Sequence, residues 1–510
     1  MSLYSVLFDG SSGSARNEVL EPPAFLADLN LDQVIDHITA NKEDYDLKPF
    51  FYAPLTDARA IQYRHEVMQD LESETLLANI RSFAEKMIVV RRYLNLVSRL
   101  DVRNHMEGWH LEAALVYCEA VANLARDLGQ APLRSRGLLA FRSFLMGYAT
   151  SDQFLPLAAE AKQLKADLSG VKYCVTIKQG TVKVRGYEAE PDYSIEVERT
   201  FERFKQGAVK DYRLRLYAGA GMNHVEAQIL DCVAKLQPDL FAGLHQFCVR
   251  HSQFLDETTC AFDREIQFYV AYLEFIGTLK RAGLRFCYPQ MATKKEVYDC
   301  EGFDIALANK LVRENTLVVC NDFYLQGGER VFVVSGPNQG GKTTFARTFG
   351  QLHYVACLGC PVPGTEARLF LYDGLFTHFE KQEDIKSLRG KLQDDLVRIH
   401  GVLEEATPNS VLIMNEIFSS TTLTDAILLS REIMERILDL DLLCVWVTFL
   451  DELASCSEKT VSMLSTVVPE NPALRTFKIV RKPADGLAYA LSIAEKHHVT
   501  YEQIMERIQP

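Results

Sequence analysis

The sequence has no uninterrupted apolar run of the ~18 or more residues that a membrane-spanning helix needs. Its first residues also lack the basic start and long apolar run of a secretory signal peptide. Positive charge is not in excess either. The formal net charge is −13, so no general basic field draws in nucleic acid, and only a local basic patch could do so. These absences predict a cytoplasmic protein with no membrane segment.

Internal repeats and low-complexity tracts are also missing, and the composition is 48% hydrophobic and 24% charged, as in ordinary globular proteins. The twelve cysteines are scattered, and several lie in apolar runs, as Cys118, Cys232 and Cys444 do. This distribution is typical of buried free thiols in a reducing compartment. A chain of 510 residues is too long for one hydrophobic core, so we expect several domains.

The first half of the chain has a helical pattern that a small β element interrupts. Residues 1–28 contain clusters of Ser, Gly and Pro and are expected to be a loose segment. Residues 29–300 are predicted to form a helical core and lever domain, because apolar residues recur every three or four positions, as they do from Leu111 to Leu128. Near residues 171–197 the period changes to two around the turn Gln179-Gly180, which predicts a β-hairpin and a possible third strand.

From residue 301 to residue 510 the pattern is that of an α/β domain. Short apolar runs at residues 331–334, 411–414 and 444–447 stand among helical segments. Such runs are typical of central strands in a mostly parallel sheet. The fold class predicted is therefore multidomain: a mostly α-helical N-terminal core and lever with a β insertion, followed by an α/β nucleotide-binding domain.

The most specific motif is the segment from Gly336 to Thr343, which fits G-x-x-x-x-G-K-[ST]. It follows an apolar strand and precedes a helical run, the context that such a phosphate-binding loop requires. Glycines let the backbone N–H groups face the phosphates, and the helix adds its positive N-terminal end. Lys342 is expected at the β- and γ-phosphates, and the Thr343 hydroxyl at Mg²⁺. The alternative is a glycine-rich turn with a chance lysine, which this context makes improbable.

A second motif ends the apolar run at residues 411–414 with Asn415-Glu416. Many P-loop ATPases have Asp-Glu at this place, the Asp in the Mg²⁺ shell and the Glu polarising the attacking water. Asn415 can accept a hydrogen bond from Mg²⁺-bound water but brings no charge, so weaker Mg²⁺ retention is expected. Glu416 is the candidate catalytic base. The alternative is a strand that merely ends at a polar edge.

These residues and others after them resemble the MutS family. The loop with its flanking residues, Ser335 to Thr344, is similar to the MutS form Gly-Pro-Asn-x-Gly-Gly-Lys-Ser-Thr, and the likeness is collinear over about residues 315–510. It includes Asn321-Asp322, Val362-Pro363, residues 375–378, Thr421, Thr422 and Asp425, Thr448, and Glu452-Leu453. The resemblance implies an ABC-type ATPase domain with ATP and Mg as cofactors. It implies a nucleotide-binding set of Gly336, Pro337, Asn338, Gln339, Gly340, Gly341, Lys342, Thr343, Thr344 and, near the adenine, Asn321.

The sequence also departs from the family pattern. The helical core begins near residue 29, so no mismatch-binding domain is expected. In the family a Ser-Gly-Arg-Ser-Thr loop meets the nucleotide of the opposite subunit. Here only Ser387 and Arg389 match it, and they are the candidates to act across a homodimer. Glycines after the Asp-Glu pair become Phe418 and Ser420, and a histidine becomes Phe449. ATP binding is therefore better supported than fast hydrolysis.

A basic stretch beside the β element supplies the candidate DNA contacts, by analogy with the clamp at the end of the family's lever. They are Arg199, Arg203, Lys205, Lys210, Arg213 and Arg215. Acidic residues are interleaved, so a solvated helix face is an equal alternative. A thinner basic candidate contains Arg91, Arg92, Arg99 and Arg103. The lone C-x-x-C of Cys357 and Cys360 favours buried thiols over metal or redox chemistry.

The function predicted is a MutS-like ATPase that couples ATP binding and hydrolysis to binding of DNA, of a structure rather than a mismatch, in DNA repair. The alternative from a different class is a nucleotide-gated scaffold that binds protein or RNA and hydrolyses ATP slowly or not at all. Asn415, the altered loop at residues 387–391 and the acidic net charge favour that alternative.

Overall fold

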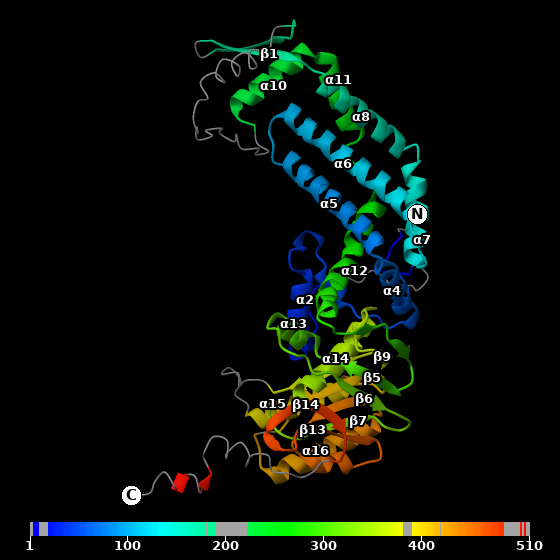
Figure 1. The fold of residues 1–510 in the computed structure, drawn as a ribbon, viewed down its shortest axis with the longest axis vertical. Helices are drawn as coiled ribbons and strands as arrows, with labels where there is room; N and C mark the ends of the chain where they lie inside the picture. The colour runs from blue at the N-terminus through cyan, green and yellow to red at the C-terminus, as the bar shows by residue number, and fades with distance from the viewer. Residues whose placement is uncertain are drawn as a thin grey trace.

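The computed structural model describes residues 4–9, 19–178, 181–189, 222–380, 390–418, 420–483, 500–501 and 504–505. Within them the chain is elongated. A helical arm occupies one end, a mixed α/β region occupies the other, and helices α2, α4, α12 and α13 lie between the two (Figure 1). The helical first half and the α/β second half both agree with the fold class that the sequence predicts.

The first half of the described chain is almost entirely helical. Its helices are α1 (Phe25–Asp28), α2 (Leu31–Thr39), η1 (Glu43–Tyr45), α3 (Lys48–Tyr52), α4 (Ala58–Leu71), α5 (Glu74–Val97), α6 (Arg103–Gln130), α7 (Arg136–Ala149), α8 (Phe154–Ser169), α10 (His224–Leu236), α11 (Pro238–Arg250) and α12 (Glu257–Arg281).

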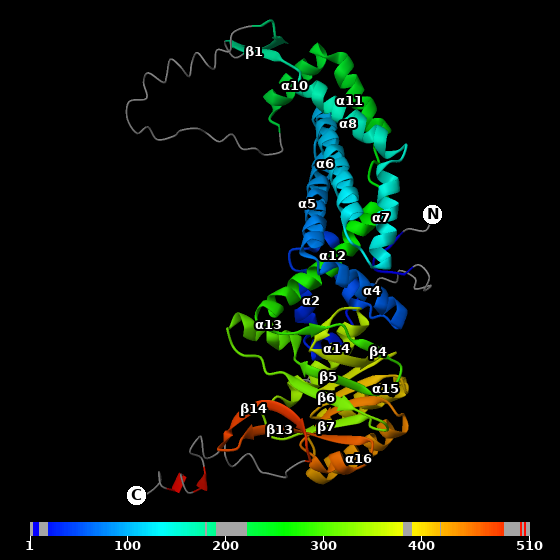
Figure 2. The same ribbon diagram turned by 45° about the vertical axis from the view of Figure 1, so that its right-hand side comes forward.

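The long helices α5 and α6 lie side by side along the arm in both views (Figures 1 and 2). Ser73 begins α5 by accepting a hydrogen bond from the backbone of Leu76, which satisfies an otherwise free N–H group. The apolar stripe predicted on α6 is confirmed, since Leu111, Val121 and Leu128 are buried. Burying such a stripe is what holds a long helix in a folded protein, because intrinsic helix propensity alone is weak.

The predicted hairpin is present at the far end of the arm, where β1 (Tyr173–Lys178) pairs antiparallel with β2 (Thr181–Gly186). The third strand considered near residues 193–197 lies outside the described residues.

Apart from this hairpin, every strand in the described residues lies in the second half. The strands are β3 (Phe286–Cys287), β4 (Gln290–Ala292), β5 (Val297–Gly302), β6 (Asn321–Leu325), β7 (Val331–Ser335), β8 (Val362–Pro363), β9 (Glu366–Phe370), β10 (Leu375–Phe379), β11 (Val411–Asn415), β12 (Leu443–Val447), β13 (Thr460–Val468) and β14 (Asn471–Arg481). The helices among them are α13 (Ile305–Arg313), α14 (Lys342–Cys357), α15 (Lys391–Glu405), α16 (Leu423–Asp439) and η2 (Asp451–Ser455).

The main sheet has the strand order β10-β11-β12-β7-β13-β14. The three strands predicted from apolar runs are β7, β11 and β12, and they are parallel neighbours at its centre, as expected. Every residue of β7 and β12 is buried, which explains why these runs contain no alternating polar residue. A second sheet has the order β4-β9-β5-β6.

The predicted domain boundary at residue 301 falls inside β5, and strands β3 and β4 precede it. These early strands pair with segments much later in the chain: β3 with β8, β4 with β9, and β5 with both β6 and β9. The α/β region therefore begins about fifteen residues before the predicted boundary, near Phe286. Short strands that find their partners far along the chain leave little periodicity for the sequence to reveal.

The loose segment expected at residues 1–28 is contradicted for the part that is described. Val6 and Leu7 are buried, and the backbone of Val6 bonds the Glu265 carboxylate at 2.9 Å and the Tyr269 hydroxyl at 2.5 Å. Helix α1 begins at Phe25 and lies against β10, where Thr377 donates a hydrogen bond of 2.6 Å to Asp28. Glu265 and Tyr269, more than 250 positions away, hold Val6, so local composition could not predict its order. Tyr63 and Arg64 bond the carbonyls of Ser5 and Leu7.

One half-buried ionic cluster ties several loops of the α/β region together. The carboxylate of Asp441 lies 3.0 to 3.1 Å from three cationic side chains, which are those of Lys295, Arg330 and Lys459. Their hydrogen bonds hold the pKa of Asp441 at about 2, although partial burial works in the opposite direction. Within the described chain, no helix has the length and apolar character needed to cross a membrane.

Candidate functional site

The glycine-rich loop from Gly336 to Gly341 connects the end of β7 to the start of α14, as the sequence predicts. Gly336 and Gly341 have φ angles of 112° and 92°, a backbone region that favours glycine. Gln339 also has a positive φ, of 60°. The loop therefore curls tightly before α14 begins at Lys342, and the N-terminal end of that helix faces into the curl.

Strand β13 supports the loop from below through the buried Ser465. Its hydroxyl donates a hydrogen bond of 2.8 Å to the carbonyl of Gly340. A Cβ atom at Gly340 would lie 2.2 Å from this hydroxyl, and one at Gly336 would lie 2.9 Å from the Ser465 carbonyl. Close packing thus requires glycine at both positions, and at Gly336 the positive φ favours glycine as well.

The side chain of Lys342 folds back over the loop. Its ammonium group lies 3.0 Å from the Gly336 carbonyl, 3.2 Å from the Asn338 side-chain oxygen and 3.7 Å from the Glu416 carboxylate. Burial lowers the pKa of Lys342 from its usual value, and the neighbouring Glu416 opposes that shift. The ammonium group of Lys342 is therefore poorly hydrated, and its neighbours in the loop are oxygen atoms of the protein.

The two residues predicted to hold a divalent cation lie in direct contact. The Thr343 hydroxyl donates a hydrogen bond of 2.8 Å to the side-chain oxygen of Asn415. Thr343 is in the first turn of α14, and Asn415 ends β11. Hydroxyl and amide oxygens converge here at the carboxyl end of the parallel strands, so the donor set fits a hard cation such as Mg²⁺.

Glu416 follows directly in a left-handed conformation with a φ of 51°. Its backbone N–H bonds the carbonyl of Val447 at 2.9 Å, which ties it to the end of β12. Phe418 also has a positive φ, of 61°, which costs roughly 1 kcal/mol or more for a residue with a side chain. Its ring is 1% exposed in the core against α16, and this burial offsets the strain. The bond to Val447 and the buried Phe418 ring therefore fix the turn after β11, at a place where the MutS pattern has glycine.

Asn321 lies at the start of β6 and bonds strand β14 with both ends of its side-chain amide. It accepts from Ile479 at 2.8 Å and donates to the Phe477 carbonyl at 3.2 Å. Strand β14 also brings Arg475 to the loop, where its Nε atom donates to the Asn338 carbonyl at 3.2 Å. Sequence reasoning missed Ser465, Arg475 and Phe477, because their only signal is the β-branched content of residues 460–468 and 475–480.

The structure thus brings most predicted nucleotide-site residues together. Pro337 accepts from the Gly340 backbone at 3.2 Å, and Thr344 lies half-buried in the first turn of α14. The predicted trans-acting residues Ser387 and Arg389 lie outside the described residues, and so do the DNA candidates Arg199, Arg203, Lys205, Lys210, Arg213 and Arg215.

The far end of α14 is bonded to the helices that lead into the arm. The carbonyl of Cys357 accepts from the Leu55 backbone at 2.7 Å, and that of Leu358 accepts from Arg64 at 2.8 Å. The Tyr272 hydroxyl of α12 donates to the Pro361 carbonyl at 2.6 Å. One helix therefore begins at the glycine-rich loop and ends against α4 and α12.

The C-x-x-C pair lies in this same junction, and its predicted burial is confirmed. Cys357 and Cys360 are both fully buried free thiols. Burial raises the pKa of Cys357 to about 12 and raises that of Cys360 as well. The thiolate is the form of cysteine that reacts and binds metals, and such buried thiols contain almost none of it near neutral pH.

Comparisons with known proteins agree with this geometry. Residues 332–508 match the family model of MutS domain V. The DNA mismatch repair protein MutS of Thermotoga maritima is 20% identical over 487 residues, which cover 88% of this chain and 59% of that protein. Its counterparts are 26% identical in Bacillus cytotoxicus and 24% identical in Orientia tsutsugamushi, over 55% and 41% of this chain.

The chain spans between about a quarter and three fifths of the length of these relatives. The matched family model begins within β7 and covers the glycine-rich loop, Asn415 and Glu416, and the relatives extend the similarity into the helical half. This chain is therefore similar to MutS proteins, by the family model in its α/β half and by the Thermotoga maritima protein along most of its length.

Proposed function

We propose that the protein is an ATPase that couples binding and hydrolysis of ATP to binding of DNA, with a DNA structure rather than a mismatch as the ligand. The observation that carries the proposal is the convergence of Lys342, Thr343, Asn415 and Glu416 around one glycine-rich loop. Similarity to MutS supports the DNA part, since the similar proteins are DNA mismatch repair proteins by name.

In this proposal ATP places its phosphates in the loop, against the backbone N–H groups and the start of α14. Lys342 exchanges its contacts with the Gly336 carbonyl and Glu416 for phosphate oxygens, which are stronger partners for an ammonium group. The exchange releases the Glu416 carboxylate, which then accepts a proton from the water that attacks the γ-phosphorus. Bound Mg²⁺ supplies charge neutralisation of the phosphates, and Thr343 and Asn415 are the residues that hold it.

Asn321 belongs to the adenine end of the site in this proposal, held in place by β14. The family's subunits pair so that each completes the other's site. By that likeness we propose a homodimer in which Ser387 and Arg389 act across the interface. The contacts of α14 with α4 and α12 offer a physical route from the nucleotide to the arm.

A nucleotide-gated scaffold that binds protein or RNA and turns over slowly or not at all is the second candidate. The observation that favours it is the uncharged Asn415, which bonds Thr343 directly where an aspartate is usual. The two candidates share the ATP site and differ in turnover and in the effect of DNA.

Steady-state ATP hydrolysis of the purified protein, with and without duplex and branched DNA, separates them. The matched controls are Glu416→Gln, which keeps the shape of the side chain, and Lys342→Ala, which removes the cation. We expect Glu416→Gln to bind a fluorescent ATP analogue normally but to lose turnover by about 10² or more. Lys342→Ala is expected to lose binding. Binding without turnover in the wild type, unchanged by DNA, would refute the ATPase and leave the scaffold.

A further inference from the structure

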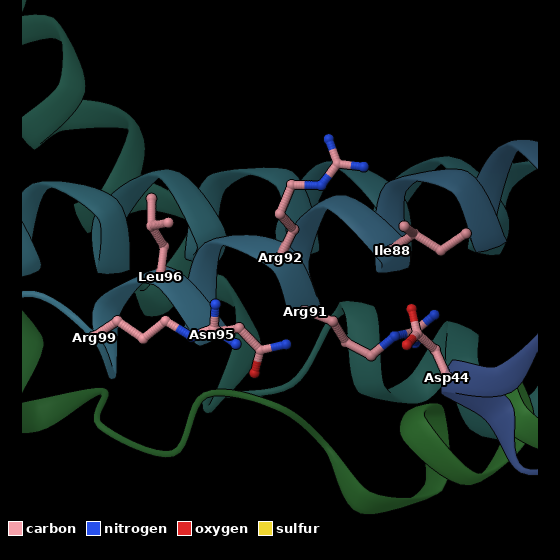
Figure 3. Close-up of a pocket in the computed structure, with 7 residues that line it drawn as sticks. All are labelled: Asp44, Ile88, Arg91, Arg92, Asn95, Leu96 and Arg99. Atoms are coloured by element: carbon pink, nitrogen blue, oxygen red, sulfur yellow. The ribbon is translucent and has the colours of Figure 1, made fainter. Parts of the chain in front are cut away.

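A second basic site lies on the arm, on helix α5 and apart from the nucleotide loop. A cavity of about 410 Å³ is lined by three arginines and one acid, with Asn95 and two apolar side chains completing the wall; the seven are Asp44, Ile88, Arg91, Arg92, Asn95, Leu96 and Arg99. Figure 3 shows Arg91 and Asn95 on α5 and Arg99 in the turn directly after it, with Asp44 beside Arg91. The formal charge of the lining is +2, three arginines less one aspartate, on a protein whose net charge is −13.

Arg91 is held in place by contacts within the protein. It forms an ion pair with the buried Asp263 and lies 4.5 Å from the centre of the Tyr45 ring. Its Nε and Nη2 atoms are buried and lack a hydrogen-bond partner among the described residues. These enclosed nitrogens do not face the cavity, so Arg91 contributes its fixed positive charge to the wall, and the exposed arginines beside it are the donors for an anion.

Arg92 and Arg99 supply the solvent-exposed positive charge of the site. Both are exposed, and within the described parts of the chain neither side chain has an ion pair or hydrogen bond. In contrast, Arg103 of the predicted basic group is engaged by Glu107 at 2.9 Å and does not line the cavity. The thinner basic candidate from the sequence therefore resolves into three arginines with one shared cavity.

The spacing of these residues suits an extended chain of phosphates. From Arg91 to its end at Val97 helix α5 rises about 9 Å, at ~1.5 Å per residue, and Arg99 follows in the next turn. Phosphates of one DNA strand follow at ~3.4 Å of rise each, so several can face this row. In both ribbon views α5 forms the edge of the arm on the side toward which α10 and the β1–β2 hairpin lean (Figures 1 and 2).

We propose that the cavity lined by Arg91, Arg92 and Arg99 is a phosphate-binding site, whose ligand is the sugar-phosphate backbone of nucleic acid or a free polyphosphate. The nucleic-acid form rests on the proposed DNA binding, whereas the phosphate chemistry does not. Asn95 donates to phosphate oxygens from between the arginines. Asp44 also lines the cavity, beside Arg91 (Figure 3), and its carboxylate lowers the affinity because it repels a bound anion.

The first test measures binding of a short fluorescein-labelled DNA duplex by anisotropy across a potassium chloride series. The test protein is Arg92→Gln/Arg99→Gln. The control is Arg126→Gln/Arg134→Gln, which removes the same charge from α6 and from the turn before α7. We expect the test variant to bind at least about fivefold more weakly and the slope of log affinity against log salt to fall by about 2, since each phosphate contact contributes roughly 0.9. The control variant is expected to match the wild type.

The second test uses inorganic tripolyphosphate and calorimetry, in Lys342→Ala protein so that the nucleotide loop does not contribute. Loss of tripolyphosphate binding in the Arg92→Gln/Arg99→Gln variant, with unchanged DNA affinity, would identify free polyphosphate as the ligand. Asp44→Asn is expected to tighten whichever ligand binds, a gain that a purely structural role of this residue does not produce.

The proposal is overturned if both pairs of substitutions have equal effects on DNA and tripolyphosphate, or if neither ligand is affected. Its failure is distinct from failure of the proposed function, because ATP turnover and its loss in Glu416→Gln are measured on the same proteins. If the protein hydrolyses ATP but the Arg92→Gln/Arg99→Gln substitutions change neither DNA nor tripolyphosphate binding, only the proposed second site is refuted. A protein without turnover whose α5 variant loses tripolyphosphate refutes only the ATPase.

Discussion

Substituting Asn415 by aspartate adds one negative charge at the end of β11 without changing the shape of the side chain. The fold tolerates this change, because an aspartate oxygen can accept the Thr343 hydrogen bond of 2.8 Å as the amide oxygen does. Asn415 is half-buried at the strand end, in contact with Thr343 rather than packed in the apolar core. The variant therefore tests the charge alone.

The expected gain follows from the strength of hydrogen bonds to charged acceptors. A neutral hydrogen bond contributes about 1 kcal/mol net, and one to a charged group contributes about 2 kcal/mol. The difference of ~1 kcal/mol corresponds to about a fivefold change in an equilibrium constant. If Asn415 accepts from Mg²⁺-bound water, Asn415→Asp is expected to lower the Mg²⁺ concentration for half-maximal ATP hydrolysis about fivefold.

The assay is a Mg²⁺ titration of steady-state hydrolysis at saturating ATP, with binding of a fluorescent ATP analogue followed in parallel. Asn415→Leu is the matched control of similar volume, and it is expected to shift the titration in the opposite direction. An unchanged Mg²⁺ midpoint in both variants would refute the placement of Asn415 beside the cation. A shifted midpoint with an unchanged maximal rate would assign Asn415 to cation binding and leave Glu416 to set the rate.

Three further outcomes follow from the described contacts. Gly340→Ala is expected to lower nucleotide affinity at least about tenfold without unfolding the protein, since the added Cβ meets the Ser465 hydroxyl at 2.2 Å and displaces the loop; fluorescent-nucleotide binding and circular dichroism test this. Asp441→Asn is expected to lower the free energy of unfolding by about 1 kcal/mol in urea at neutral pH, a figure reduced for solvent screening. Its pKa is depressed to about 2, so the contribution is complete above the ordinary carboxyl range, is lost as the pH falls toward 2, and is absent in the variant throughout. In native protein Cys357 and Cys360 are expected to resist alkylation, read by mass spectrometry, while exposed Cys232 reacts; equal labelling would contradict their burial.

The glycine-rich loop could be predicted from the sequence because its requirements are local. Gly336 and Gly341 take positive φ angles, and the strand before them is a continuous apolar run. Each requirement leaves a residue type at a fixed spacing. The same holds for α6 and for the β1–β2 hairpin, whose periods of repetition are written directly in the chain.

The parts that the sequence did not reveal depend on partners far away along the chain. Ser465 supports a loop that precedes it by about 125 residues, and its serine hydroxyl has no unusual sequence context. Residues 5–7 are ordered by Tyr63, Glu265 and Tyr269. Strand β4 has only three residues and pairs with β9. None of these contacts imposes a periodicity on its own segment, so a single sequence contains no signal for them.

Helix α14 explains how chemistry at the loop can reach the arm. In the proposed function its first residue, Lys342, changes partners when phosphates enter, whereas the carbonyl that follows its last turn is held by Arg64. Arg64 is fully buried, lies 5.1 Å from the ring centre of Phe268 on α12, and has its Cβ atom only 2.6 Å from where a Cβ of Gly359 would stand. Such close packing leaves no free volume to absorb a displacement of the helix. We therefore expect a shift of α14 to move α4 and α12 with it, and these two helices lie between the α/β region and the arm that carries α5 (Figure 1).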